Sequence, residues 1–180
     1  APRGKDKWLR PDEAERLIAA CAPHLKPLVV FMLMTGCRLG EALALDWRHV
    51  DLPVRRVTFV NTKNGETRGV PLNDRAFEAL ANLPLGLVRR PGPGVSIRET
   101  ERDGKVFRRP DGLPYKEREG SYTGQIRKSW TGACKRAGLK GYTPHDLRHT
   151  WATWAYGATH DLHALMQLGG WKTMSMVMRY

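Results

Sequence analysis

This sequence of 180 residues has few cysteines, a shortage of acidic residues and no long apolar run. Its three cysteines, Cys21, Cys37 and Cys134, are far apart and odd in number, which argues against a disulfide framework or a zinc site. We therefore expect reduced thiols in a cytosolic compartment. The longest apolar run, residues 28–34, is too short to cross a bilayer, and residues 1–7 lack the apolar stretch of a secretory signal. No membrane partner is expected.

Basic charge is what the sequence has in excess. Thirty Lys and Arg residues stand against 18 Asp and Glu, giving a formal net charge of +12. Such an excess favours a polyanionic partner, because neutralising phosphates releases condensed counterions. A solvated basic surface is the plainer alternative. The length and the 41% hydrophobic content fit one folded domain with a substantial core.

Apolar spacing and helix-terminating residues predict a mainly helical fold. Pro11 and the acids after it open a first helix, and a buried helix over residues 25–34 ends at Gly36. A short helix over residues 39–45 puts Arg38 at a helix boundary. Further helices are expected from the Asn73 cap to residue 81, over residues 122–137, over residues 145–156 with Gly157 as the stop, over residues 161–168, and from Thr173 to Tyr180.

Two segments depart from the helical pattern. Residues 55–72 predict a β-hairpin, because Lys63-Asn64-Gly65 is a tight-turn signal between two apolar stretches. The fold class is therefore α+β, with a small antiparallel sheet. Residues 84–118 are rich in Gly, Pro and Arg without a clear period. They form either a loop that touches DNA, through Arg89, Arg90, Arg108 and Arg109, or a solvated, partly disordered insertion.

The residues that carry chemistry lie at both ends of the chain. Near the C-terminus come Thr143-Pro144-His145-Asp146-Leu147-Arg148-His149-Thr150, then Leu168-Gly169-Gly170-Trp171, with Tyr180 nine residues later. Upstream lies Thr35-Gly36-Cys37-Arg38-Leu39-Gly40-Glu41. Two arginines, a histidine, an indole and a phenol can together bind a phosphodiester and attack it. Singly, each has a structural explanation: Arg38 could pair with Glu41, Trp171 could fill the core, and Lys63 could be an exposed turn residue.

Taken together, these motifs resemble the catalytic domain of the tyrosine recombinases, the phage integrase family. The resemblance runs from Trp8 to Tyr180, with the motifs in the family's order, and Thr62-Lys63-Asn64-Gly65 followed by Val70-Pro71-Leu72 looks like the family's lysine hairpin. It implies a site-specific recombinase or integrase that cleaves and rejoins double-stranded DNA through a 3′-phosphotyrosine, with no metal, ATP or other cofactor. It also implies a tetramer on DNA for the full-length protein, in a bacterial cytoplasm and associated with the nucleoid.

The same resemblance implies a role for each site residue. Tyr180 would be the nucleophile, and Arg38 and Arg148 would clamp the non-bridging phosphate oxygens. Lys63 would protonate the leaving 5′-oxygen. His145 would transfer a proton or bind the phosphate, and Trp171 would orient or bind it, because indole donates a hydrogen bond but does not shuttle a proton. Two further residues are expected behind the site: Glu41, holding Arg38 or its neighbours, and His149.

Residues 1–180 are expected to be a single catalytic domain, without the N-terminal core-binding domain and the C-terminal tail of relatives. Two other classes of function stay open. A metal-dependent nuclease could use Glu41, Asp46 and Asp146 as ligands, although their spacing does not indicate a metal site. A DNA-binding module without catalysis could keep the fold, although binding alone does not require this set of residues.

Overall fold

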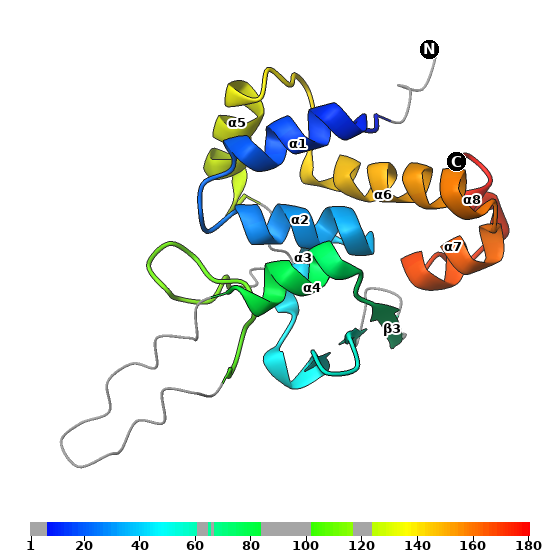
Figure 1. Ribbon diagram of the computed structural model, residues 1–180, viewed down its shortest axis with the longest axis horizontal. Helices are drawn as coiled ribbons and strands as arrows, with labels where there is room; N and C mark the ends of the chain where they lie inside the picture. The colour runs from blue at the N-terminus through cyan, green and yellow to red at the C-terminus, as the bar shows by residue number, and fades with distance from the viewer. Residues whose placement is uncertain (1–6, 61–64, 66, 84–101, 117–123) are drawn as a thin grey trace.

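The computed structural model describes residues 7–60, 65, 67–83, 102–116 and 124–180. These residues form eight α-helices, one 3-10 helix and a three-stranded antiparallel sheet in the order β1-β2-β3 (Figure 1). The arrangement confirms the mainly helical fold with a small sheet. The elements are α1 (Pro11–Ala20), α2 (Lys26–Thr35), α3 (Leu39–Ala44), η1 (Trp47–His49), β1 (Val50–Asp51), β2 (Arg56–Phe59), β3 (Arg68–Pro71), α4 (Asp74–Ala81), α5 (Arg127–Arg136), α6 (Pro144–Thr159), α7 (Leu162–Gly169) and α8 (Met174–Val177).

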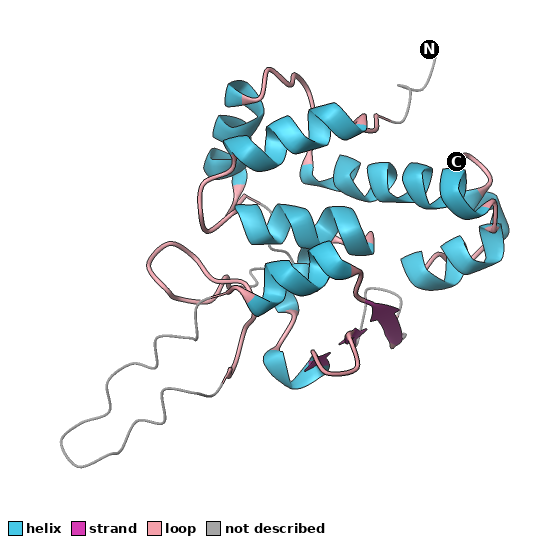
Figure 2. Ribbon diagram, in the orientation of Figure 1, coloured by secondary structure: helices cyan, strands magenta, loops and turns pink. Residues whose placement is uncertain are grey.

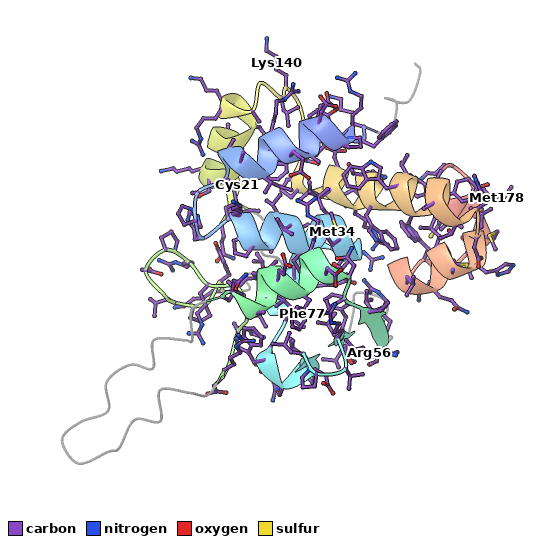
Figure 3. The ribbon with its side chains drawn as sticks, viewed as in Figure 1. Cys21, Met34, Arg56, Phe77, Lys140 and Met178 are labelled. Carbon is purple, nitrogen blue, oxygen red and sulfur yellow. The ribbon has the colours of Figure 1, made fainter. Side chains whose placement is uncertain are left out.

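Helix α2 forms the centre of the core, packed against α4 and α6, while the sheet lies at one edge of the helical body (Figure 2). Helix α2 is apolar nearly all round, as expected of a buried helix. Phe31 is fully buried, with its ring centroid 6.3 Å from that of Phe59 and 5.2 Å from that of Phe107. Met34, labelled in Figure 3, accepts a hydrogen bond on its sulfur from the side chain of Asn73, the N-cap of α4.

Gly36 ends α2 and sets the path of the chain towards Arg38. Its φ of 65° lies in the left-handed region, and its amide donates to the Met32 carbonyl. A Cβ at this position would come within 2.1 Å of the Trp151 ring on α6. Glycine is therefore required both by backbone conformation and by the close approach of α6, and the helix end predicted at Gly36 is confirmed.

The segment before α1 ties the start of the described chain to α6. The buried Leu9 donates its backbone N–H to Thr150 Oγ1 at 2.9 Å, and its carbonyl accepts from Trp154 Nε1 at 3.1 Å. Thr150 also donates to the Asp146 carbonyl, one turn earlier on α6. These contacts fix α6, the helix that carries His145, Arg148 and His149.

The sheet is an antiparallel meander in which Val57 pairs with Val70 and Phe59 with Arg68. This register confirms the hairpin strands, whereas β1, only two residues long, was not predicted. Residues 61–64 and 66, with the turn signal and Lys63, lie outside the described residues. Within residues 7–60, 65, 67–83, 102–116 and 124–180, no helix is long and apolar enough to span a membrane.

Three predicted element ends were wrong. Helix α6 passes through Gly157 and ends at Thr159, followed by the C-cap residue His160, whose φ is 52°. Gly157 is exposed, with no heavy atom near its missing Cβ, so it costs the helix only about 1 kcal/mol relative to alanine. Helix α5 begins at Arg127, because residues 124–126 form a turn. Tyr180 lies beyond the end of α8 rather than within it.

Part of the predicted basic loop is built into the core. Phe107 and Tyr115 are buried, and Val106 donates its backbone N–H to the Leu45 carbonyl. The Arg108 guanidinium donates to the carbonyls of Lys105, Asp103 and Gly112, while Arg109 pairs with Asp111. Arg89 and Arg90 lie outside the described residues. Residues 102–116 are thus anchored to the core by Val106, Phe107 and Tyr115, and contact of Arg108 and Arg109 with DNA stays a prediction.

Candidate active site

A carboxylate shared by two arginines forms one wall of the site. Glu41, on the first turn of α3, accepts the backbone N–H of Arg38 at 2.7 Å and Arg38 Nη1 at 2.8 Å. Arg68 of β3 binds both oxygens of the same carboxylate, each at 2.8 Å, in a fork-to-fork pair. The third donor of Arg68, Nε, reaches the Leu168 carbonyl at 3.1 Å. A single side chain therefore joins the hairpin, α3 and the end of α7.

These contacts keep Glu41 ionised. Its side chain is 7% exposed. Burial raises the pKa of its carboxyl, but hydrogen bonds and charge from Arg68, and then from Arg38, more than offset burial and lower the pKa to about 2. Glu41 therefore holds both arginines at neutral pH. The ion pair with Arg38 was the structural alternative for that arginine, but Arg38 remains partly exposed, with 27% of its side chain accessible.

Arg148 is the most buried charge of the site. Arg148 is 2% exposed and projects from α6 towards the end of α2. Its Nη1 donates to the Gly36 carbonyl at 2.7 Å. Its guanidinium carbon lies 4.0 Å from the centroid of the Trp171 ring. Burial, and then the charge of Arg38, lower the pKa of Arg148 to about 10, while Glu41 opposes the change. Arg148 is still a cation at pH 7.

One donor of Arg148 is left over. Among the described residues, the buried Nη2 atom of Arg148 has no hydrogen-bond partner. A buried polar group without a partner costs about 1–3 kcal/mol, and more when it is charged. Such donors in native proteins call for an explanation, and an anionic ligand at Nη2 would supply one.

Trp171 is held by its neighbours in the C-terminal segment. Gly170, with a φ of 68°, ends α7 and turns the chain back. A Cβ on Gly169 would come within 1.9 Å of the Trp171 ring, so the indole packs directly against this glycine. The ring stacks on Trp151 with centroids 6.3 Å apart and lies 5.6 Å from the ring of Tyr180.

Two histidines on α6 connect the site to Tyr180. The rings of His145 and His149, one helical turn apart, meet edge to face with centroids 4.8 Å apart. His149 Nδ1 lies 2.6 Å from the Tyr180 hydroxyl, within hydrogen-bond distance. Burial lowers the pKa of His145, and the neighbouring His149 and Arg148 lower it further. His145 is therefore mostly neutral at pH 7.

Most of the predicted site residues meet in one place, although they come from segments far apart in the sequence. Figure 1 shows α2 and α6 side by side, with β3 and α7 facing each other below them. The residues gathered there are Arg38, Glu41, His145, Arg148, His149, Trp171 and Tyr180. Arg68 belongs to the same cluster but was not predicted, because a lone arginine in a strand gives no periodic or motif signal.

The carboxylates proposed as metal ligands are engaged elsewhere. Both oxygens of Glu41 bind arginines, Asp46 accepts the Arg48 amide at the start of η1, and Asp146 accepts the amide and hydroxyl of Thr143 at the start of α6. No group of three or more His, Cys, Asp or Glu residues in the described ranges could hold a metal ion.

The sequence profile of the phage integrase family matches residues 7–180. The chain belongs to the phage integrase family. Among relatives, it is similar to the integrase of Salmonella phage P22, with 33% identity over 192 residues that cover 99% of this chain and 45% of that protein. The chain thus spans about half the length of this integrase relative.

Two solved structures, of a recombinase and of an integrase, have the same fold as this family member. The XerA recombinase superposes with a TM-score of 0.78 at 25% identity, covering 100% of this chain and 60% of that chain. The catalytic domain of the bacteriophage HP1 integrase superposes with a TM-score of 0.68 at 27% identity, covering 96% of this chain and 85% of that chain.

Proposed function

We propose that this chain is the catalytic domain of a site-specific DNA recombinase that cuts and rejoins DNA through a 3′-phosphotyrosine at Tyr180. The observation that carries the proposal is the unused Nη2 donor of the buried Arg148, beside Arg38 and the cluster around Tyr180. A phosphodiester has the charge and oxygen geometry to fill this position, because guanidinium forks match phosphate oxygens.

The charge of the whole chain supports a nucleic-acid substrate. A net charge of +12 attracts DNA and makes binding depend on counterion release. The related P22 and HP1 proteins are integrases and XerA is a recombinase, which supports strand exchange rather than binding alone. Double-stranded DNA is therefore the proposed partner. Assembly into a tetramer on DNA and action at the nucleoid in the bacterial cytoplasm are the finer parts of this proposal.

In the proposed first step the Tyr180 oxygen attacks a DNA phosphorus. The bond from phosphorus to the 5′-oxygen breaks, the 3′-phosphate becomes attached to Tyr180, and the phenol loses its proton. Ionising a free phenol at pH 7 costs roughly 4 kcal/mol, so neighbouring charge or a base must offset that cost. Arg38 and Arg148 stabilise the charge that develops on the phosphate oxygens.

The leaving 5′-oxygen needs a proton, and Lys63 is proposed to supply it. Support comes from the resemblance of its hairpin to the family pattern and from Arg68, five residues later, which binds Glu41 at the site. Religation is the reverse reaction, in which the 5′-hydroxyl attacks the phosphotyrosine. The phosphodiester bond energy stays in the protein–DNA link, so ATP is not required.

A pool of nicked suicide duplexes tests the proposal. The duplexes carry random sequence around the nick and a 5′-label on the cleavable strand. Because of the nick, the short 5′-hydroxyl fragment diffuses away after attack, and the labelled fragment stays attached to the protein. We expect a labelled adduct on a denaturing gel that persists in EDTA, disappears in Tyr180→Phe and survives in the control Tyr156→Phe, a tyrosine that packs against His160. An adduct retained by Tyr180→Phe, or abolished by EDTA, contradicts the proposal.

A further inference from the structure

The Tyr180 hydroxyl and a ring nitrogen of His149 form a short contact inside the site. His149 is 7% exposed, and its Nδ1 lies 2.6 Å from the Tyr180 oxygen. The two rings tilt against each other with centroids 5.7 Å apart. A buried histidine that touches the attacking oxygen is placed where proton transfer requires a base, within about 2.6–3.2 Å of the proton it removes.

Chemistry decides which of the two groups donates. A phenol is a stronger hydrogen-bond donor than a neutral imidazole N–H, and a bare imidazole nitrogen is a much stronger base than a phenol oxygen. The favoured arrangement therefore has the Tyr180 O–H donating to a bare Nδ1, with the ring proton of His149 on Nε2. In this tautomer Nδ1 carries the lone pair that would accept the proton.

On this geometry we infer that His149, rather than His145, is the catalytic base that removes the proton of Tyr180. The inference rests on the proposed recombinase function and specifies the base of that reaction. As the Tyr180 oxygen forms its bond to phosphorus, its proton passes to Nδ1 and His149 becomes an imidazolium. During religation the same proton returns to the departing phenol oxygen, so each strand exchange leaves the histidine unchanged.

His145 serves a different role in this scheme. Its ring packs edge to face against His149 rather than lying between that ring and the phenol. Burial and the nearby Arg148 keep its pKa low, and His149 is one of the groups that lower it. Two imidazolium rings 4.8 Å apart would repel each other. A neutral His145 therefore allows His149 to carry the positive charge during the reaction.

The surrounding cations affect both partners of the transfer. The Arg179 guanidinium carbon lies 5.3 Å from the centroid of the Tyr180 ring, and Arg148 precedes His149 in the sequence. Positive charge beside a phenol favours the phenolate, while positive charge beside an imidazole opposes the imidazolium. A phosphate in the site would bring negative charge that stabilises the imidazolium. The arrangement therefore suits transfer of the Tyr180 proton to His149 only when the phosphate is bound.

The resting hydrogen bond can be tested without DNA. Nitrogen NMR of the chain labelled with ¹⁵N-histidine reports the tautomer of His149 directly. We expect a bare Nδ1 and a protonated Nε2, with the Nδ1 resonance shifting when Tyr180→Phe removes the hydroxyl. A protonated Nδ1 that donates to the phenol oxygen would overturn the inference, because such a nitrogen has no lone pair with which to take the proton.

Single-turnover cleavage of the suicide duplexes tests the reaction itself. His149→Asn keeps a polar group near the Nδ1 position but does not accept a proton, whereas His149→Ala removes both functions. We expect both variants to cleave about 10²-fold or more slowly than wild type, the scale of a lost general base, with DNA affinity changed less than about twofold. An asparagine variant as fast as wild type means that the hydrogen bond alone matters, and an alanine variant as fast as or faster than wild type means that the contact restrains Tyr180. Either result overturns the role of His149.

The two proposals fail in different ways. A wild-type chain that forms no Tyr180-dependent adduct overturns the recombinase proposal and, with it, any base for that step. A wild-type chain that forms the adduct, beside a His149→Asn chain of equal speed, overturns only the assignment of His149. The asparagine variant and the NMR measurement also keep the test decisive if His149→Ala does not fold.

Discussion

The guanidinium of Arg148 lies 4.0 Å from the centroid of the Trp171 ring. The resemblance to the recombinase family implied that Trp171 orients or binds the phosphate, with its indole N–H as the donor; this contact uses the face of the ring. A cation over an aromatic face is stabilised by roughly 2 kcal/mol when both are desolvated. Trp171 thereby holds a buried arginine whose Nη2 atom has no partner among the described residues.

The first prediction separates the ring face from the N–H of Trp171. We expect Trp171→Phe to keep most of the cleavage rate, because a benzene ring still covers Arg148, and Trp171→Ala to lose about 30-fold, the equivalent of roughly 2 kcal/mol. Single-turnover rates on suicide DNA measure both. Equal losses in the two variants would show that the indole N–H, and not the ring, is the active group.

The second prediction concerns the pair of Arg68 and Glu41. Arg68→Met leaves the buried carboxylate with one arginine instead of two, and we expect it to lower the free energy of unfolding by about 3 kcal/mol. Arg75→Met is the matched control, because Arg75 makes the same fork with Glu15 at the surface and is worth at most about 1 kcal/mol. Urea unfolding at neutral pH compares the two. Similar losses would mean that burial of the Glu41 pair adds nothing.

The third prediction is a pH dependence that belongs to Glu41. Its folded pKa, about 2, lies below its ordinary value of 4.5, so its stabilisation is complete above pH 4.5 and is lost as pH falls towards 2. A shift of this size corresponds to about 3 kcal/mol. We expect Glu41→Gln to be less stable than wild type at pH 6 and to lose less stability than wild type between pH 4.5 and pH 2. Parallel stability curves for the two proteins in urea would contradict this account.

Sequence patterns predicted those features of the fold that depend on neighbouring residues. Apolar spacing gave the buried α2, and a glycine at its end was correctly expected to terminate it. Gly157 was wrong as a stop, because an exposed glycine is tolerated when the rest of a helix packs well. A strand of two residues such as β1 has too little pattern to detect.

The candidate site, like the fold, was predictable from the sequence only in part. The motif residues could be named from the sequence, but their contacts depend on segments far apart in the chain. Arg68 is 27 residues from Glu41 and 100 residues from Leu168, so no local pattern relates them. His149 was expected behind the site, and its hydrogen bond to Tyr180, 31 residues away, exists only because the chain after α8 returns to α6.

The fourth prediction assigns different chemistry to Arg38 and Lys63. Arg38→Lys keeps the charge but loses the planar fork, and we expect cleavage to fall about 10²-fold or more. Lys63→Ala removes the proposed acid, so a substrate with a 5′-thiol leaving group, which needs no proton, should restore its rate. The same substrate should not restore Arg38→Lys. If the thiol rescues both variants alike, Lys63 is not the acid.

The fifth prediction concerns DNA binding by the chain itself. The net charge of +12 and the arginines proposed to bind phosphate indicate contacts that are mainly electrostatic and carry little sequence information. Affinity measured by anisotropy should therefore fall steeply with salt, with a slope of about 0.9 for each phosphate neutralised, and should differ little between random duplexes. If Arg89 and Arg90 touch the backbone, replacing both with Gln lowers that slope by roughly two units, while Arg75→Gln leaves it unchanged. An unaltered slope in the double variant would show that these two arginines do not neutralise phosphates, and a shallow slope with strong preference for one sequence would show that the chain reads bases directly.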